Sequence, residues 1–99
     1  MYEAELHRLQ GELLRAREPE ATDSASACFQ RALSAAHRQG ARALELRAAM
    51  SLSRLFEHAA GQAREEARHA LATVLATFKS GFDTADLREA RALLSHSSR

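Results

Sequence analysis

The stretch from Arg42 to Ala60 constrains the fold most, because as a helix it has apolar or small residues on two sides. One stripe, at steps of three and four residues, comprises Leu44, Ala48, Leu52, Leu55 and Ala59. The second stripe comprises Leu46, Ala49, Ser53, Phe56 and Ala60. Two apolar stripes need two sets of covering neighbours. This stretch is therefore predicted to be the central helix of an all-α stack, and its expected outward side comprises Arg47, Met50, Arg54, Glu57 and His58.

The residues before the central helix are predicted to form one antiparallel helical hairpin. The inward stripe expected on its first helix comprises Tyr2, Leu6, Leu9, Leu13 and Ala16. That helix is predicted to end near Arg17, because the residue before a proline disfavours helical geometry, and Pro19 suits the first turn of the next helix. The second helix, residues 20–39, has a predicted buried stripe of Ala25, Cys28, Phe29, Ala32, Leu33 and Ala36. Gly40 can take a left-handed conformation at its end.

A second hairpin and a lone fifth helix are predicted to follow. Gly61 is expected to close the central helix as Gly40 closes the second, and the fourth helix, residues 62–79, has Ala67, Leu71, Val74, Leu75 and Phe78 inward. At the start of the fifth helix, Asp83 can cap and Phe82 can pack onto Leu87. This helix has no hairpin partner. Leu93 and Leu94 on it are therefore the predicted contact for self-association, since exposed apolar ends of a repeat stack seek a neighbour.

An internal repeat supports the stack. A shift of 42 residues aligns Leu13 with Leu55, Ala25 with Ala67 and Phe29 with Leu71, with Pro19 opposite Gly61. Each unit is then one helical hairpin, which cannot bury its apolar face alone. The predicted organisation is a single domain over residues 1–99, with hairpins at 2–39 and 42–79 and a fifth helix at 84–96. The alternative is a plain bundle of four or five helices with accidental register.

The first unit resembles the tetratricopeptide repeat, through Gly11, Leu14, Ala25, Phe29 and Ala32. The resemblance implies a right-handed superhelical fragment in which the first helix of each hairpin lines a concave face. More narrowly, the chain resembles the C-terminal repeats of large bacterial signalling ATPases, which often carry nucleotide-cyclase or transcription-regulator domains upstream. The segments that carry this likeness are AELHRLQGELL, ACFQRALSAAHRQGARALELRAAMSLSRL and SGFDTADLREARALL. It implies a scaffold region of a bacterial cytoplasmic signalling protein.

Composition and motifs argue against catalysis and against a membrane span. The formal charge of +1 gives no global basic excess of the kind typical of nucleic-acid binding. No stretch reaches the roughly 20 apolar residues of a membrane span, and no signal peptide is recognised, so a cytoplasmic location is expected. The glycines occur singly, and the histidines lack metal-site spacing, so neither a cofactor nor an enzymatic activity is predicted. Glu65, Glu66 and His69 are interpreted as solvated surface, and Cys28 as a packing residue.

The remaining candidate site is the expected concave face. Its predicted partner-binding residues are Arg8, Glu12, Arg15, Arg47, Met50, Arg54, Glu57, His58, Arg88 and Arg91. Arginines outnumber acidic residues there, and guanidinium groups pair bidentately with carboxylates, so a protein or peptide with acidic residues is the predicted partner. A charged face that only contacts solvent is the other interpretation. The leading hypothesis is a non-catalytic interaction or scaffold module, and the alternative is a nucleic-acid-binding helical domain that uses the same arginines.

Overall fold

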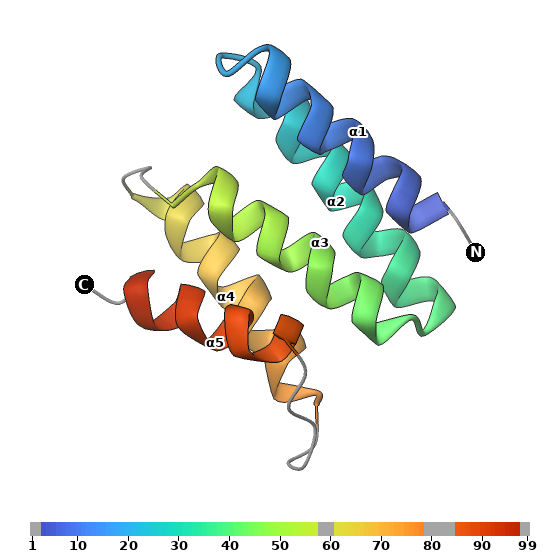
Figure 1. The fold of residues 1–99 in the computed structure, drawn as a ribbon, viewed down its shortest axis with the longest axis vertical. Helices are drawn as coiled ribbons and strands as arrows, with labels where there is room; N and C mark the ends of the chain where they lie inside the picture. The colour runs from blue at the N-terminus through green and yellow to red at the C-terminus, as the bar shows by residue number, and fades with distance from the viewer. Residues whose placement is uncertain (1–2, 58–60, 79–84, 98–99) are drawn as a thin grey trace.

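The computed structural model describes residues 3–57, 61–78 and 85–97, and the fold in these ranges is all-helical, as predicted (Figure 1). The five helices are α1 (Glu3–Arg17), α2 (Thr22–Gln39), α3 (Arg42–Leu55), α4 (Gln62–Ala76) and α5 (Ala85–Ser97). The molecule measures 39 × 36 × 20 Å, so its shortest dimension is about two helix diameters. None of the described helices is both long and apolar enough to cross a membrane.

Helix α3 is the centre of the fold, and it packs against each of the other four helices. Every residue from Ala48 to Ser53 is buried, so the middle of α3 is covered on all sides. The prediction that Met50 points outward is wrong: it is 3% exposed, because α5 folds back over this side of α3. The helix is also shorter than predicted and ends at Leu55, while residues 58–60 lie outside the described part of the chain.

Two main clusters of apolar side chains lie on opposite sides of α3. The first cluster joins α2, α3 and α4 through Ala25, Phe29, Leu52 and Ala67. The second joins α3, α4 and α5 through Leu46, Ala49, Met50, Leu71, Val74, Leu87 and Ala90. The predicted stripe of α2 is confirmed, since five of its six residues are buried and Leu33 is partly buried against both clusters. A helix with two apolar sides thus separates two cores.

The apolar face of α1 is not the one predicted. Leu6, Leu9 and Leu13 are 56%, 50% and 60% exposed, whereas the buried residues of this helix are Ala4 and Gly11. A Cβ atom on Gly11 would lie 2.6 Å from Cε1 of Phe29, so α1 approaches α2 through its smallest residues. Of the other residues predicted inward, Ala16 is exposed and Tyr2 lies outside the described residues.

The helix ends agree only in part with prediction. Gly40 is left-handed at the end of α2, with φ 67° and ψ 22°, as predicted. Gly61 also has a positive φ of 82°, but it directly precedes α4 and does not cap α3, whose C-cap residue is Phe56. Pro19 lies in the turn before α2 and not in its first helical turn. The predicted cap and staple at Asp83 and Phe82 lie outside the described residues.

Helix α5 packs back onto α3 and α4. Leu87 and Ala90 are buried, and Leu93 and Leu94 are partly buried against the second cluster. Leu93 and Leu94 are thus less exposed than expected, because they pack on the α3–α4 hairpin, and self-association through them stays a prediction. Arg68 of α4 also donates to the Leu94 carbonyl at 3.3 Å.

Candidate functional site: an arginine groove between three helices

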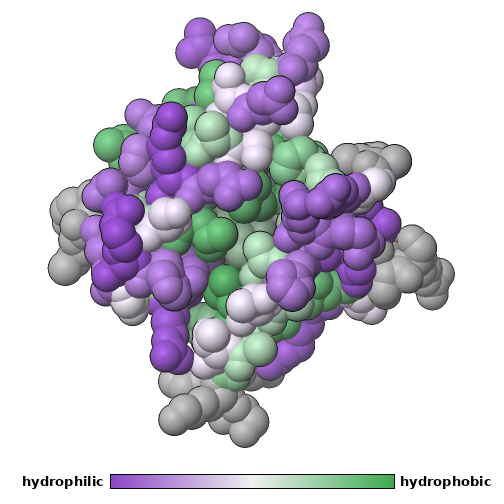
Figure 2. Space-filling model, turned by 180° about the vertical axis from the view of Figure 1, so that it is seen from behind, coloured by the Kyte–Doolittle hydropathy of each residue, from purple (hydrophilic) through white to green (hydrophobic). Residues whose placement is uncertain are grey.

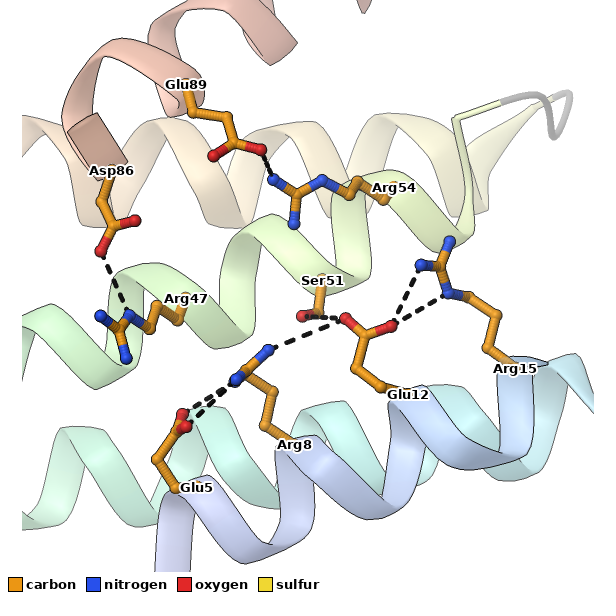
Figure 3. Close-up of polar contacts among 9 residues, drawn as sticks. All are labelled: Glu5, Arg8, Glu12, Arg15, Arg47, Ser51, Arg54, Asp86 and Glu89. Carbon is orange, nitrogen blue, oxygen red and sulfur yellow. Dashed lines mark hydrogen bonds and ion pairs between the residues drawn. The ribbon is translucent and has the colours of Figure 1, made fainter. Parts of the chain in front are cut away.

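Charged side chains from α1, α3 and α5 meet on one side of the molecule (Figure 3). They surround a cavity of about 190 Å³, here called the arginine groove, which is lined by Arg8, Arg47, Met50, Arg54, Asp86 and Glu89. Met50 is buried and forms its apolar floor. The remaining lining residues are two acids and three arginines, so the groove is polar and close to charge balance.

On α1 the charged residues recur every three or four positions and pair along the helix. Arg8 donates from Nε and Nη2 to both carboxylate oxygens of Glu5, at 2.8 and 3.1 Å. Arg15 contacts Glu12 at 3.0 Å, and Arg8 reaches the same carboxylate at 3.8 Å. Spacings of three and four residues place these side chains on one helical side, so α1 presents an ordered row of paired charges to the groove.

A buried serine links this row to α3. Ser51 is 1% exposed, and its Oγ donates to Oε2 of Glu12 at 2.9 Å. Glu12 therefore accepts from Arg15 on its own helix and from Ser51 on the neighbouring one. This contact fixes the approach of α1 to α3 at the edge of the groove.

The opposite wall consists of ion pairs between α3 and α5. Arg47 donates from Nε to Oδ2 of Asp86 at 3.1 Å, and Arg54 pairs through Nη2 with Oε2 of Glu89. Residues 47 and 54 are seven apart, which places both on one side of α3. The carboxylates of α5 lie over these guanidinium groups and are 35% exposed at Asp86 and 52% at Glu89.

The charges of the three helices act on one another. The hydrogen bond from Arg8 is the largest cause that lowers the pKa of Glu5 below its ordinary value of 4.5; partial burial opposes the shift, and the charges of Arg8 and Arg47 add to it. The same hydrogen bond raises the pKa of Arg8, with smaller contributions from the negative charges of Glu5, Glu12 and Asp86. Both groups therefore stay ionised over the neutral range.

The structure gathers some of the predicted binding residues and separates others. Arg8, Arg47, Met50 and Arg54 line the groove, and Glu12 and Arg15 border it. Glu57 is partly buried in the turn after α3, and His58 lies outside the described residues. Arg88 and Arg91 are exposed on α5 but are not among the groove-lining residues, and each makes another contact.

Sequence reasoning missed the acidic half of the groove. Asp86 and Glu89 lie 39 and 35 residues from the arginines that they contact, so no local spacing brings them together. Asp86 lies in the first turn of α5, where a negative charge suits the helix dipole. The Ser51 bond to Glu12 spans 39 residues and was missed for the same reason.

The dimensions of the groove limit its ligands. Sites for drug-sized molecules occupy about 300 to 1,000 Å³, so a cavity of about 190 Å³ suits single side chains of a longer ligand. Among the described residues, no group of three or more His, Cys, Asp or Glu side chains is arranged to hold a metal ion. Cys28 is buried, as expected of a packing residue.

A second hollow lies on the opposite face, between α2 and α4. It has a volume of about 270 Å³ and an apolar floor that includes Leu33, Leu52 and Phe56. Figure 2 shows this side of the molecule, where hydrophobic residues lie between ridges of hydrophilic ones. The charged pairs of the arginine groove have no counterpart among its lining residues, which include Glu66 as the one ionisable side chain.

Comparisons with protein-family models, with curated proteins and with solved structures found no match to this chain. The resemblance to tetratricopeptide repeats and to the repeats of bacterial signalling ATPases therefore stays a prediction.

Proposed function

We propose that the chain is a non-catalytic protein-interaction module that binds an acidic peptide or protein segment in the arginine groove. The observation that carries this proposal is that two arginines of α3 line an open groove, and each is engaged by a carboxylate of α5. A groove that already holds carboxylates against guanidinium groups has the geometry to hold those of a ligand.

The carboxylates of the ligand are expected to displace the carboxylates of α5 from the arginines of α3. Arg47 contacts Asp86 through Nε at one oxygen, whereas Arg8 holds both oxygens of Glu5. A ligand carboxylate that pairs bidentately with Arg47 or Arg54 would make the stronger contact. Asp86 and Glu89 are partly exposed, so water can solvate them once they are displaced, and such pairs contribute only about 0 to 1 kcal/mol.

The charge arrangement favours a peptide over a nucleic acid. Four carboxylates, those of Glu5, Glu12, Asp86 and Glu89, lie within the same network as the arginines. A phosphate backbone requires a net positive track, and these carboxylates would repel it. A peptide with separated acidic and neutral residues can place one carboxylate at a time against an arginine.

The test is a binding titration with a fluorescent oligoglutamate peptide whose glutamates are separated by glycines. It is compared with the same peptide carrying lysines and with a DNA duplex that has the same number of negative charges as the glutamate peptide. Arg54→Ala should weaken oligoglutamate binding about tenfold, whereas Glu89→Gln should tighten it several-fold because the internal competitor loses its charge. Arg31→Ala on α2, an exposed arginine outside the groove, is the matched control and should change nothing.

Two results would contradict the proposal. One is oligoglutamate binding that responds equally to Arg54→Ala and Arg31→Ala, because the groove would then contribute nothing specific. The other is tighter binding of the duplex than of oligoglutamate, with affinity that falls steeply with salt, which would favour the nucleic-acid alternative.

A further inference from the structure

Helix α1 carries an apolar face that nothing in the described structure covers. Among the described residues, the exposed large apolar side chains are Leu6, Leu9 and Leu13, here called the α1 leucine face. They lie on the side of α1 opposite Gly11, through which the helix packs on Phe29 of α2. Three leucines that are half or more exposed on one helical face form a patch, and such patches mark interaction sites.

The internal repeat shows that this face is one that the stack normally buries. A shift of 42 residues places Leu6, Leu9 and Leu13 opposite Ala48, Ser51 and Leu55 of α3. On α3 these positions meet the first hairpin: Ser51 bonds to Glu12, and Leu55 packs with the cluster that contains Phe29. The α1 leucine face thus has the register of an interface, and no described residue covers it.

A second shift of 42 residues leads to α5. Leu6 and Leu9 then correspond to Ala90 and Leu93. Both pack against the cluster formed by the α3–α4 hairpin. Two of the three equivalent faces in the chain are therefore covered by helices, and the third is open.

The spacing of the face specifies what kind of surface fits it. Steps of three and four residues lead from Leu6 through Leu9 and Leu13 to Ala16, which is also exposed. This is the a/d seam of a short coiled coil, whose natural partner is another helix. Along one flank, at intervals of seven, lie Glu3, Gln10 and Arg17, all exposed.

We propose that the α1 leucine face binds the same face of a second copy of this chain, with the two α1 helices antiparallel about a two-fold axis. A two-fold interface needs a self-complementary patch, and leucines meeting leucines satisfy that requirement. In the antiparallel arrangement this flank of one helix faces the same flank of the other, so Glu3 of each copy lies opposite Arg17 of the other. Glu3 also contacts Arg38 of its own chain at 3.4 Å and is 52% exposed, so a second guanidinium group can reach it. The acidic side chains on the other flank, Glu5 and Glu12, are already paired with arginines of their own helix.

The association is expected to be weak. Specific stable interfaces bury roughly 1,200 to 2,000 Å² in total, and one face of a 15-residue helix from each copy gives less. The dimer should therefore form reversibly as protein concentration rises into the micromolar range and above. This predicts a different contact from Leu93 and Leu94 of α5, which the fold already uses internally.

Sedimentation velocity over a hundredfold range of protein concentration tests the proposal. The parent chain should shift from monomer to dimer, and Leu9→Lys should raise the dissociation constant about tenfold or more, because it places two charges in the apolar seam. Leu9 is half exposed, so this variant should keep the helical circular dichroism of the parent. Ala72→Lys, an added charge on an exposed position of α4, is the matched control and should leave the dimer intact.

A charge exchange tests the orientation. Arg17→Glu should weaken the dimer, and adding Glu3→Arg should restore it, because the antiparallel pairing is then re-formed with reversed signs. Failure of the double variant to recover overturns the antiparallel arrangement. A parent that stays monomeric at every concentration, or a dimer that is indifferent to Leu9→Lys, overturns the α1 interface.

Discussion

Gly11 is the one described glycine at which an added Cβ atom would meet another side chain. The ring of Phe29 occupies the space that a side chain at this position would need. Its Cε1, Cδ1 and Cζ atoms would lie 2.6, 2.8 and 3.0 Å from an added Cβ. Phe29 is fully buried, so the ring has no free space to enter. Gly11→Ala should therefore lower the free energy of unfolding by about 1 to 2 kcal/mol in a urea melt, because overpacking outweighs the gain of about 1 kcal/mol in helix propensity.

The control for this prediction is the same substitution in a Phe29→Leu background. Leucine lacks the ring edge, so the added methyl group should then cost much less or even stabilise the helix. An equal cost in both backgrounds would show that contact with the Phe29 ring is not the cause of the destabilisation.

Glu5 should make the stability depend on acid pH. Its pKa in the folded chain lies below the ordinary value of 4.5 because Arg8 bonds to the charged form. The unfolded chain therefore binds the proton more readily, so the stabilisation is complete above the ordinary pKa and is lost as pH falls through the lower folded pKa. Glu5→Gln should cost about 1 kcal/mol at neutral pH, and its deficit should shrink steadily below pH 4.5 in paired urea melts.

The comparison variant is Glu20→Gln, at an exposed position in the turn before α2. It should melt like the parent at each pH. A constant deficit for Glu5→Gln from neutral to acid pH would mean that Arg8 gains nothing from the negative charge of Glu5.

At the scale of one element, α3 offers two buried serines with opposite roles. Ser51 donates to Glu12 at 2.9 Å, whereas the Oγ of Ser53 is buried without a hydrogen-bond partner among the described residues. Ser51→Ala should destabilise the chain by about 1 to 2 kcal/mol, because it breaks a bond to a charged group. Ser53→Ala should be neutral or stabilise it by up to about 1 kcal/mol, because it removes a desolvated hydroxyl.

These two variants control each other. They lie two residues apart on one helix, carry the same change in helix propensity and differ only in the partner of the hydroxyl. Thermal or urea melts in which both substitutions lower stability equally would contradict the assignment of the Glu12 bond to α1–α3 packing.

The positions of the helices could be predicted from the sequence, but the buried side of each helix could not always be predicted. Periodicity located all five helices and the buried stripe of α2. It failed on α1, where the leucine stripe is exposed and Ala4 and Gly11 are buried. A hydrophobic period identifies a face, whereas close packing depends on small residues that let two backbones approach. Gly11 carries that information, because the absence of a side chain lets α1 approach Phe29 of α2.

Only the basic residues of the groove could be predicted from the sequence. Arg8, Arg47 and Arg54 follow from the first-helix positions of consecutive hairpins, and the structure places them around one cavity. Their acidic partners on α5 depend on how a distant helix crosses α3, which no local spacing encodes. The burial of Met50 has the same origin, because α5 is the helix that covers it.

At the scale of the whole molecule, α3 joins the other helices into one cooperative unit, and α5 is the helix held less firmly at one end. It contacts all four other helices, whereas α5 contacts α3 and α4 alone. The two main clusters of apolar side chains both include residues of α3, so loss of α3 packing affects both. In stacks of this kind the terminal element opens at lower cost than the centre.

This architecture predicts that truncating Phe29 and truncating Leu87, two buried residues of similar size, destabilise different numbers of helices. Phe29→Ala should lower the free energy of unfolding by about 3 to 5 kcal/mol, out of about 5 to 15 for a small domain. Because Phe29 of α2 lies against α1 and belongs to the cluster that joins α2, α3 and α4, amide hydrogen exchange should accelerate in all five helices. Leu87→Ala should accelerate exchange mainly in α5, since Leu87 packs at the end of the stack.

Hydrogen-exchange mass spectrometry of both variants beside the parent gives the comparison. Ala92→Ser, at an exposed position of α5, is the control for local sequence effects on exchange in that helix. If Leu87→Ala accelerates exchange in α2 as much as in α5, then α5 opens only with the whole chain. The carboxylates of Asp86 and Glu89 would then leave the arginine groove only on global unfolding, and an acidic ligand could not exchange with them in the native state.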